Sequence, residues 1–226
     1  MISFACIVPH PPILLPTVGS EADRARLKNT ISALEVLGKK FKDSNPDLII
    51  ISSPHADWGF NVPLHFLTPQ HFQGQIKTYL TGTEPAEFHF QEGKRIFEDN
   101  NLELDFKKVA FIASGDMSHC LKEDGPYGFN PEGPKFDQDL QEFLVKKEIG
   151  KILQLDDIYP GAGECGLRSF SFLLGALEAA GVKYEPEILS YEGPFGVGYL
   201  VADLKPGDKQ VGVEKQKKDG KTNKDK

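Results

Sequence analysis

The chain has 226 residues and a mass of 25.0 kDa, enough for one large domain, and its formal net charge of −7 is unevenly spread. Residues 205–226 carry +4 and residues 1–204 carry −11, and an acidic body repels phosphate backbones, so we expect no nucleic-acid partner. Three cysteines without a C-x-x-C pair, no basic signal region and no apolar run of membrane length favour a cytoplasmic protein that does not bind membranes.

The first quarter of the chain predicts a strand, a helix and a second strand. Residues 2–8 form a short apolar run that ends at Pro9 and His10. Ser20 and Asp23 resemble a capping box, and apolar residues at helical spacing then continue to Pro46. Residues 49–53 are β-branched and serine residues that lead to His55. Together these segments predict a right-handed βαβ unit with parallel strand pairing.

The middle of the chain contains a third strand that ends near a histidine. Residues 60–82 are rich in aromatic residues, Pro and Gly, and we expect short strands or loops there. A helix is predicted from Thr83 and Pro85 to about Asp99, followed by a strand over residues 109–113 that leads to His119. The glycine- and proline-rich residues 120–134 predict a loop at the rim of a site.

The last part of the chain predicts two helices and a closing strand. An amphipathic pattern covers residues 135–149, and a glycine-rich segment then leads into an apolar helix over residues 167–180. Residues 197–203 read as the last strand, and the lysine-rich residues 205–226 lack the apolar content to fold. We therefore expect a single α/β domain over residues 1–204, with a mixed, largely parallel sheet flanked by helices on both faces, and a disordered basic tail over residues 205–226.

Three predicted strands end close to His10, His55 and His119, and Glu164 lies in a glycine-bracketed loop at the start of a helix. Because the carboxyl ends of parallel strands meet at one edge of a sheet, we expect these four side chains to lie together. Two histidines and one carboxylate leave open positions on iron(II), and a histidine that is free of the metal would carry protons near neutral pH. Three further histidines, at positions 65, 71 and 89, do not follow strands, and we interpret them as structural or exposed.

Several motifs resemble those of a known enzyme family. IVPHPP, SPHAD, SGDMSH, GPYGFNPEGP, GAGECGLRSF and YEGPFGVGYL occur in this order over about residues 2–204. They resemble the class III extradiol ring-cleavage dioxygenases, the family of the B subunit of protocatechuate 4,5-dioxygenase, which also includes the Memo-like proteins. Within this family the chain is most similar to a bacterial branch that is linked with a radical-SAM partner protein.

The resemblance implies a function for each of the four side chains. It implies that His10, His55 and Glu164 bind iron(II) and that His119 is the acid/base. It further implies that a small aromatic diol and O2 are the substrates, that the diol ring is opened next to the hydroxyl groups, and that the chain forms a homo-oligomer. Asp57 and Asp116 are candidates to orient the imidazoles through hydrogen bonds.

Two other functions stay open at this stage. Memo-like relatives use a cysteine as a metal ligand, and Cys165 lies next to Glu164, so the third ligand could be sulfur. The chain would then be a metal-binding or interaction protein without ring cleavage. A zinc-dependent hydrolase that uses the same four residues is the other alternative. Arg168, four residues after Glu164, could bind a substrate anion or form an ion pair with Glu164.

Overall fold

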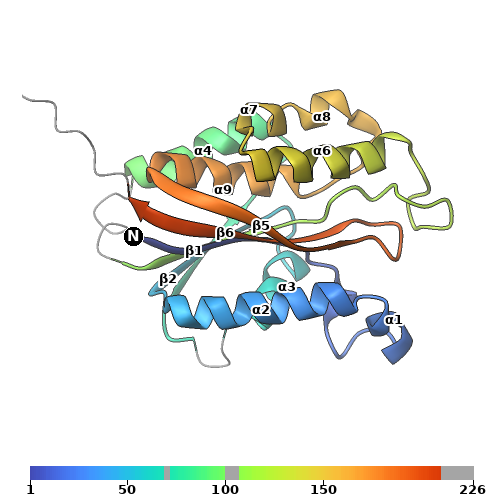
Figure 1. Cartoon of the computed structure of the whole chain (residues 1–226), viewed down its shortest axis with the longest axis horizontal. Helices are drawn as coiled ribbons and strands as arrows, with labels where there is room; N and C mark the ends of the chain where they lie inside the picture. Colours follow the sequence, from blue (N-terminus) through green and yellow to red (C-terminus); the bar gives the residue numbers. More distant parts are fainter. Residues whose placement is uncertain (69–71, 100–106, 210–226) are drawn as a thin grey trace, which may run out of the picture.

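The protein is described by a computed structural model that covers residues 1–68, 72–99 and 107–209. In these residues six strands form one sheet in the order β3-β2-β4-β1-β6-β5 (Figure 1). Strands β1 to β4 are parallel to one another, and β6 and β5 continue the sheet as antiparallel strands. Their bounds are β1 Ile2–Val8, β2 Leu48–Ser53, β3 Gln75–Leu80, β4 Val109–Ser114, β5 Val182–Glu192 and β6 Tyr199–Lys209.

Helices cover both faces of this sheet, as Figure 1 shows. One face is covered by α2 (Lys28–Ser44) and α3 (Trp58–Leu67), and α1 (Glu21–Ala25) precedes α2. The other face is covered by α4 (Ala86–Asp99), α6 (Glu132–Lys146) and α9 (Leu167–Ala179), with the short helices α7 (Ile149–Ile152) and α8 (Leu155–Ile158) between α6 and α9. The single-domain α/β fold with a mixed, mostly parallel sheet is therefore confirmed. Among the described helices, none combines the length and the apolar composition of a membrane span.

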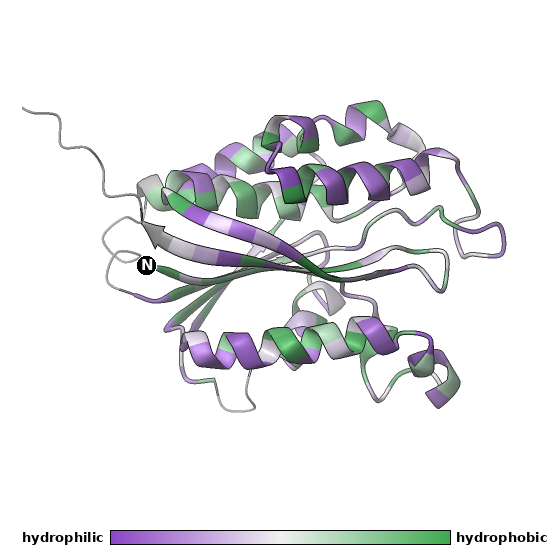
Figure 2. Ribbon diagram, viewed as in Figure 1, coloured by the Kyte–Doolittle hydropathy of each residue, from purple (hydrophilic) through white to green (hydrophobic). Residues whose placement is uncertain are grey.

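The apolar side chains of the central strands alternate between two hydrophobic cores. In β1, Ala5 and Ile7 pack towards α9, whereas Cys6 and Val8 pack towards α2. This alternation arises from the two-residue repeat of a β-strand, and a strand that is buried on both faces is apolar throughout. Figure 2 shows the resulting hydrophobic colour along the strands between the two helix layers. The register of the sheet thus determines where each strand ends and which loop residues lie at its carboxyl edge.

The predicted βαβ unit differs from the observed one because another strand lies inside it. Both β1 and β2 pair with β4, so they are parallel to each other but not adjacent. The crossover from β1 to β2 skips one strand position, and β4 occupies it. Because β4 lies outside the first 52 residues, those residues alone do not predict the gap. As a consequence, the carboxyl end of β4 lies between the ends of β1 and β2.

Several other elements differ from the prediction in their type or length. The Ser20 capping box is confirmed, but the chain turns at Arg26 and begins a second helix, α2, at Lys28. The region predicted as strands or loops contains α3, a helix that tolerates Pro63 in its interior, before β3. Strand β5 was not predicted. Strand β6 continues to Lys209, so residues 205–209 are strand and not tail, while residues 210–226 lie outside the described part of the chain.

Candidate metal centre

His10 follows β1 and is held with one ring nitrogen free. Its Nδ1 lies 3.0 Å from the Oγ of Ser114, and this hydroxyl donates its own proton to the carbonyl oxygen of Gly59 at 2.5 Å. The Ser114 oxygen therefore accepts a hydrogen bond from His10 Nδ1–H, which leaves a lone pair on Nε2. Burial, together with nearby His55, lowers the pKa of His10 to about 3. His10 is thus neutral near pH 7 and can bind a metal without losing a proton.

His55 and Cys165 lie beside the free nitrogen of His10. The imidazole rings of His10 and His55 meet edge to face with their centroids 5.1 Å apart, and Cys165 Sγ lies 3.7 Å from His10 Nε2. His10, His55 and Cys165 each offer one ligand atom, and these atoms all lie within 4.8 Å of one another. His10 is buried, Cys165 is half-buried and His55 is exposed, so the cluster opens to solvent on one side. Two imidazoles and a thiol at this spacing can hold a transition-metal ion.

A second cluster shares the thiol. Asp116, His119 and Cys165 also place one ligand atom each within 4.8 Å of the others. Asp116 accepts a hydrogen bond from the backbone N–H of His10 at 3.0 Å, and burial raises the pKa of its carboxyl to about 6. Nε2 of His119 is buried and has no hydrogen-bond partner in the described residues. Burial also lowers the pKa of His119, which favours its neutral form.

The loop that carries Asp116 and His119 is fixed by a buried carboxylate. Asp137 on α6 accepts a hydrogen bond from the backbone N–H of Ser118 at 2.7 Å and another from the Tyr191 hydroxyl at 2.6 Å. The Ser118 hydroxyl donates to the carbonyl oxygen of Ala162 at 2.6 Å and so connects the loop to the segment before Cys165. Burial raises the pKa of Asp137 to about 7. The sequence contains a signal for Asp137, because an acidic residue interrupts the buried face of an amphipathic helix.

Glu164 is not brought to either cluster. Its carboxylate accepts a hydrogen bond from the backbone N–H of Leu167 at 2.6 Å, at the start of α9, and forms a salt bridge of 3.1 Å with Arg168. An acidic side chain at a helix N-terminus satisfies an otherwise unpaired N–H group and interacts favourably with the helix dipole. The structure therefore places Cys165, the neighbouring residue, beside the histidines. Its thiol also accepts a hydrogen bond from the Asp116 backbone N–H at 3.3 Å.

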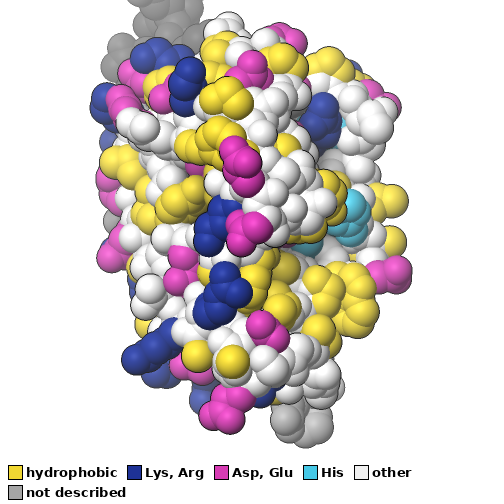
Figure 3. Space-filling model, turned by 90° about the vertical axis from the view of Figure 1, so that its right-hand side faces the viewer, with side chains coloured by type: hydrophobic (Ala, Val, Ile, Leu, Met, Phe, Trp, Pro, Cys, Tyr) yellow, Lys and Arg dark blue, Asp and Glu magenta, His cyan; other side chains and the backbone are white. Residues whose placement is uncertain are grey.

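A cavity of about 260 Å³ lies at this edge of the sheet, in front of the histidines. Figure 3 views the corresponding side of the molecule, where histidine and hydrophobic side chains lie next to one another. Tyr127, from the predicted rim loop, lies with its ring 4.9 Å from the ring of His119. The cavity is lined by His10, Pro11, Pro12, His55, Trp58, Asp116, His119, Tyr127, Val197 and Tyr199. The predicted gathering of His10, His55 and His119 at one edge is thus what the structure shows.

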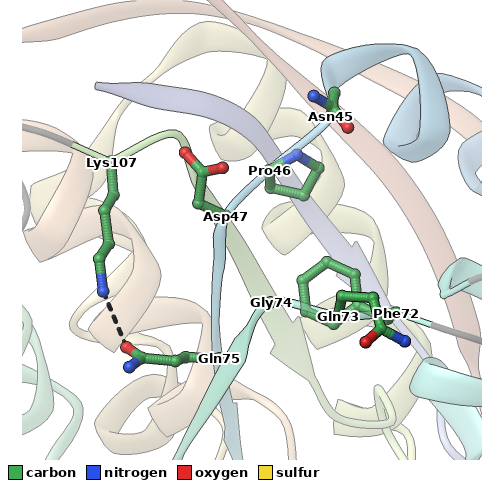
Figure 4. A pocket seen from close by; sticks show the side chains of 8 residues that line it. All are labelled: Asn45, Pro46, Asp47, Phe72, Gln73, Gly74, Gln75 and Lys107. Carbon is green, nitrogen blue, oxygen red and sulfur yellow. Dashed lines mark hydrogen bonds between the residues drawn. The ribbon is translucent and has the colours of Figure 1, made fainter.

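Other candidate positions lie away from these clusters. His65 is exposed on α3, His89 is buried in α4, and His71 is outside the described residues. A hollow of about 520 Å³ lies at the opposite edge, at the amino ends of β2 and β3 (Figure 4). Its lining contains neither histidine nor cysteine, and its lysine, Lys107, donates a hydrogen bond to Gln75 at 2.9 Å. The chemistry-bearing side chains are therefore concentrated at the carboxyl edge.

Comparison with known proteins relates the chain to one enzyme family. The model of the catalytic LigB subunit of aromatic ring-opening dioxygenase matches residues 55–202. Protein CA_C1420 of Clostridium acetobutylicum is 32% identical in an alignment that covers 88% of this chain, although the chain spans only 56% of that protein. The crystal structure of protein JW3007 from Escherichia coli K12 has a TM-score of 0.55 at 15% identity and covers 88% of this chain and 98% of its own, which is a likeness of fold.

The fold and the site define an α/β protein with candidate metal ligands gathered at the carboxyl edge of its sheet. Because the family model matches more than half of the chain, the protein belongs to the family of the catalytic LigB subunit of aromatic ring-opening dioxygenases. His10 and the first strand precede the matched residues, and the structure joins them to the matched part through β4.

Proposed function

We propose that the chain is an oxidoreductase that binds iron(II) through His10, His55 and Cys165 and opens the ring of a catechol-type compound with O2. The observation that carries the proposal is the close approach of three ligand atoms beside a cavity that His119 also lines, and the buried Nε2 of His119 has no hydrogen-bond partner in the described residues. The family of ring-opening dioxygenases supports the reaction type.

The donor set fits a transition metal of the first row. His10 Nδ1 carries the proton because it donates a hydrogen bond to Ser114, so Nε2 has a free lone pair. Metal-bound histidines typically donate such a hydrogen bond from the nitrogen that does not bind the metal. Burial and the nearby Asp116 carboxylate raise the pKa of the Cys165 thiol, whereas a bound cation stabilises the thiolate. Imidazole and thiolate ligands both bind iron and zinc, so the protein can take either ion. Glu164 stays a prediction as a ligand, and our proposal assigns its place to Cys165.

The chemistry divides between the ion and the protein. When bound, iron(II) would supply a Lewis acid for the two diol oxygens and a path for electrons from the diol to O2. His119 accepts a proton from a diol hydroxyl at Nε2 and returns it later in the reaction, a function that suits a neutral imidazole. Tyr127 packs against the ring of His119, and Pro11 and Pro12 line the same cavity.

A thiol ligand favours a second candidate function. Cys165 lies 3.7 Å from His10 Nε2, and a thiolate ligand of this kind is the feature that the Memo-like proteins share. In that case the chain would bind a metal ion tightly without consuming O2. The cavity and the ligands would be the same, so only an activity measurement separates the two functions.

The test combines metal content with oxygen uptake. Protein loaded anaerobically with iron(II) is assayed for iron per chain and for O2 consumption with a panel of catechols. We expect one iron per chain, O2 uptake and a yellow ring-opened product. Bound iron with no O2 uptake would support the Memo-like function, and activity that persists without O2 would indicate a hydrolase.

Two matched variants identify the third ligand in the same experiment. We expect Cys165→Ala to lose the iron and Glu164→Gln to keep it, because Gln can still accept the hydrogen bond from the Leu167 N–H. The opposite result, with iron lost only in Glu164→Gln, would return the carboxylate to the ligand set and contradict the assignment of Cys165. The unfolding temperature of both variants shows whether either loss is due to misfolding.

A further inference from the structure

The cavity lining contains aromatic and apolar side chains besides the candidate ligands. Trp58, at the start of α3, is 49% exposed, and Tyr127, in the loop before α6, is 65% exposed, so both rings border the opening. Val197 and Tyr199 are buried in the same lining. A substrate whose diol binds at the metal would therefore direct its ring substituents towards these side chains.

The cavity lining also lacks a cation. None of its ten residues, all of which are described, is lysine or arginine, and its carboxylate is that of Asp116. Three cations of the described loops and helix ends near the cavity already donate hydrogen bonds to other groups. Arg168 binds Glu164 and donates to the carbonyl oxygen of Glu84 at 2.8 Å, and Lys122 donates to the carbonyl oxygen of Pro194 at 3.0 Å.

Arg26 is also engaged outside the cavity. Its guanidinium donates to the same Pro194 oxygen as Lys122 and lies 4.2 Å from the centroid of the Phe195 ring. A carboxylate substituent in the cavity would lose part of its water next to Asp116 and would find no lysine or arginine in the lining, and the charge of the metal ion would already be shared with the two diol oxygens. Leaving a buried charge unpaired is strongly unfavourable, and the net charge of −11 on residues 1–204 adds a repulsion that salt screens.

We infer that this site takes uncharged single-ring catechols and rejects catechols that carry a carboxylate. The inference rests on the proposed function for the orientation of the diol, and it adds the substrate class. Both kinds of catechol would contact the metal through the same two oxygens. The selectivity therefore comes from the ring substituent that is not a hydroxyl group and from the cavity residues that it contacts. An engineered cavity of about 150 Å³ is known to bind benzene, so 260 Å³ accommodates one ring with a short substituent.

The test measures binding without turnover. Zinc-loaded protein, which cannot transfer electrons to O2, is titrated by calorimetry at pH 7.5 with 3,4-dihydroxybenzamide and with 3,4-dihydroxybenzoate. These two compounds have nearly the same shape and differ in charge. We expect the amide to bind at least ten-fold more tightly, and the difference to persist from 50 to 500 mM salt. Equal or tighter binding of the benzoate would overturn the inference, as would a difference that disappears at high salt.

A gain-of-function variant tests the same idea in the other direction. Tyr127→Arg places a cation at the exposed rim, and we expect it to tighten the binding of the benzoate relative to the amide, whereas Tyr127→Gln should not. No change in the ratio with arginine would mean that the missing cation does not set the selectivity. Selective binding by wild-type protein whose iron form takes up no O2 would refute the proposed function alone. A failure of both compounds to bind would refute the function and the inference together.

Discussion

At the scale of single residues, Ser114 decides which nitrogen of His10 is available. Its hydroxyl donates to the Gly59 carbonyl oxygen and accepts from His10 Nδ1, so the imidazole has one orientation and one tautomer. In the sequence, Ser114 directly follows the predicted strand over residues 109–113 and opens the SGDMSH motif. Its partners are 55 and 104 residues away along the chain, and nothing in a local pattern connects them.

We expect Ser114→Ala to weaken zinc binding ten- to hundred-fold, since partners that orient a ligating histidine typically contribute this much. The affinity is measured by competition with a chromophoric chelator. Ser44→Ala is the control, because Ser44 donates to the Phe41 carbonyl oxygen at the end of α2, far from the ligands. Equal affinities for the two variants would show that Ser114 does not set the orientation and tautomer of the His10 imidazole for metal binding.

A substitution of His119 tests whether this residue carries protons or binds the metal. We expect His119→Gln to keep one iron per chain and to lower the rate of O2 uptake by a factor of about 10² to 10⁴, the usual contribution of a general acid or base. Iron content and O2 consumption are measured on the same sample. Loss of iron in this variant would make His119 a ligand and would require another proton carrier.

Asp137 predicts how stability depends on pH. Its pKa is raised from 3.8 to about 7 by burial, so the folded protein binds this proton more tightly than the unfolded chain does. Protonated Asp137 contributes fully to the free energy of unfolding below about pH 4. This contribution is lost as the pH rises to about 7, and the loss is up to about 1.4 kcal/mol per pH unit. In urea titrations the stability of wild type relative to Asp137→Asn should fall over this range. A constant difference between the two proteins would contradict the raised pKa.

At the scale of elements, close contact between α4 and α9 supports the loop that carries Cys165. A methyl group at Gly175 would overlap the carbonyl oxygen of Phe90, and one at Gly93 would overlap that of Phe172. The two helices can pack at this distance only because these positions lack a side chain. Since α9 begins immediately after the loop, its position against α4 and β4 determines where Cys165 lies.

We expect Gly175→Ala to reduce the free energy of unfolding by about 1–3 kcal/mol, the usual cost of inserting a methyl group into a packed core. Gly150→Ala is the matched control, because a methyl group there would meet no atom within 4 Å, and alanine is the better helix former. Thermal unfolding gives both values. If the two variants were equally stable, the helices would have to tolerate a wider separation.

Some elements could be predicted from the sequence and others could not, for identifiable reasons. Strands β1, β2 and β4 are buried on both faces and read as apolar runs, so the gathering of three histidines at their ends could be predicted directly. Helix α3 was missed because Pro63 and the aromatic residues around it are atypical of a helix interior. Glu164 and Cys165 are adjacent, and the hydrogen bond that Cys165 accepts from the Asp116 backbone N–H, 49 residues away along the chain, is a tertiary contact that no local pattern predicts.

At the scale of the whole molecule, the sheet extends further along the chain than the composition predicts. Residues 205–209 are lysine-rich in sequence but pair with β5, for example Lys205 with Glu185 and Lys209 with Val182. Lys205 is exposed, and a charged side chain is compatible with strand pairing where one face of the strand remains in solvent. The boundary of the folded domain is therefore set by backbone pairing.

Two truncations test this boundary. We expect deletion of residues 210–226 to leave the unfolding temperature and the metal content unchanged, because this segment has few apolar side chains to bury. Deletion of residues 205–226 should lower the unfolding temperature, because it removes five residues of β6 from their pairing with β5. Equal unfolding temperatures would mean that the end of β6 contributes nothing to stability.

The position of β4 between β1 and β2 bears on when the site forms during synthesis. A chain that has emerged from the ribosome as far as residue 120 already carries His10, His55 and Asp116, but it lacks the thiol, which lies 155 residues after His10. It also lacks α9, whose residues pack over β4. Because domains form from the N-terminus as they emerge, the three ligands that we propose can come together only after Cys165 has been made. If they bind the metal as proposed, full affinity for the ion arises late, after the strands that precede the histidines are in place.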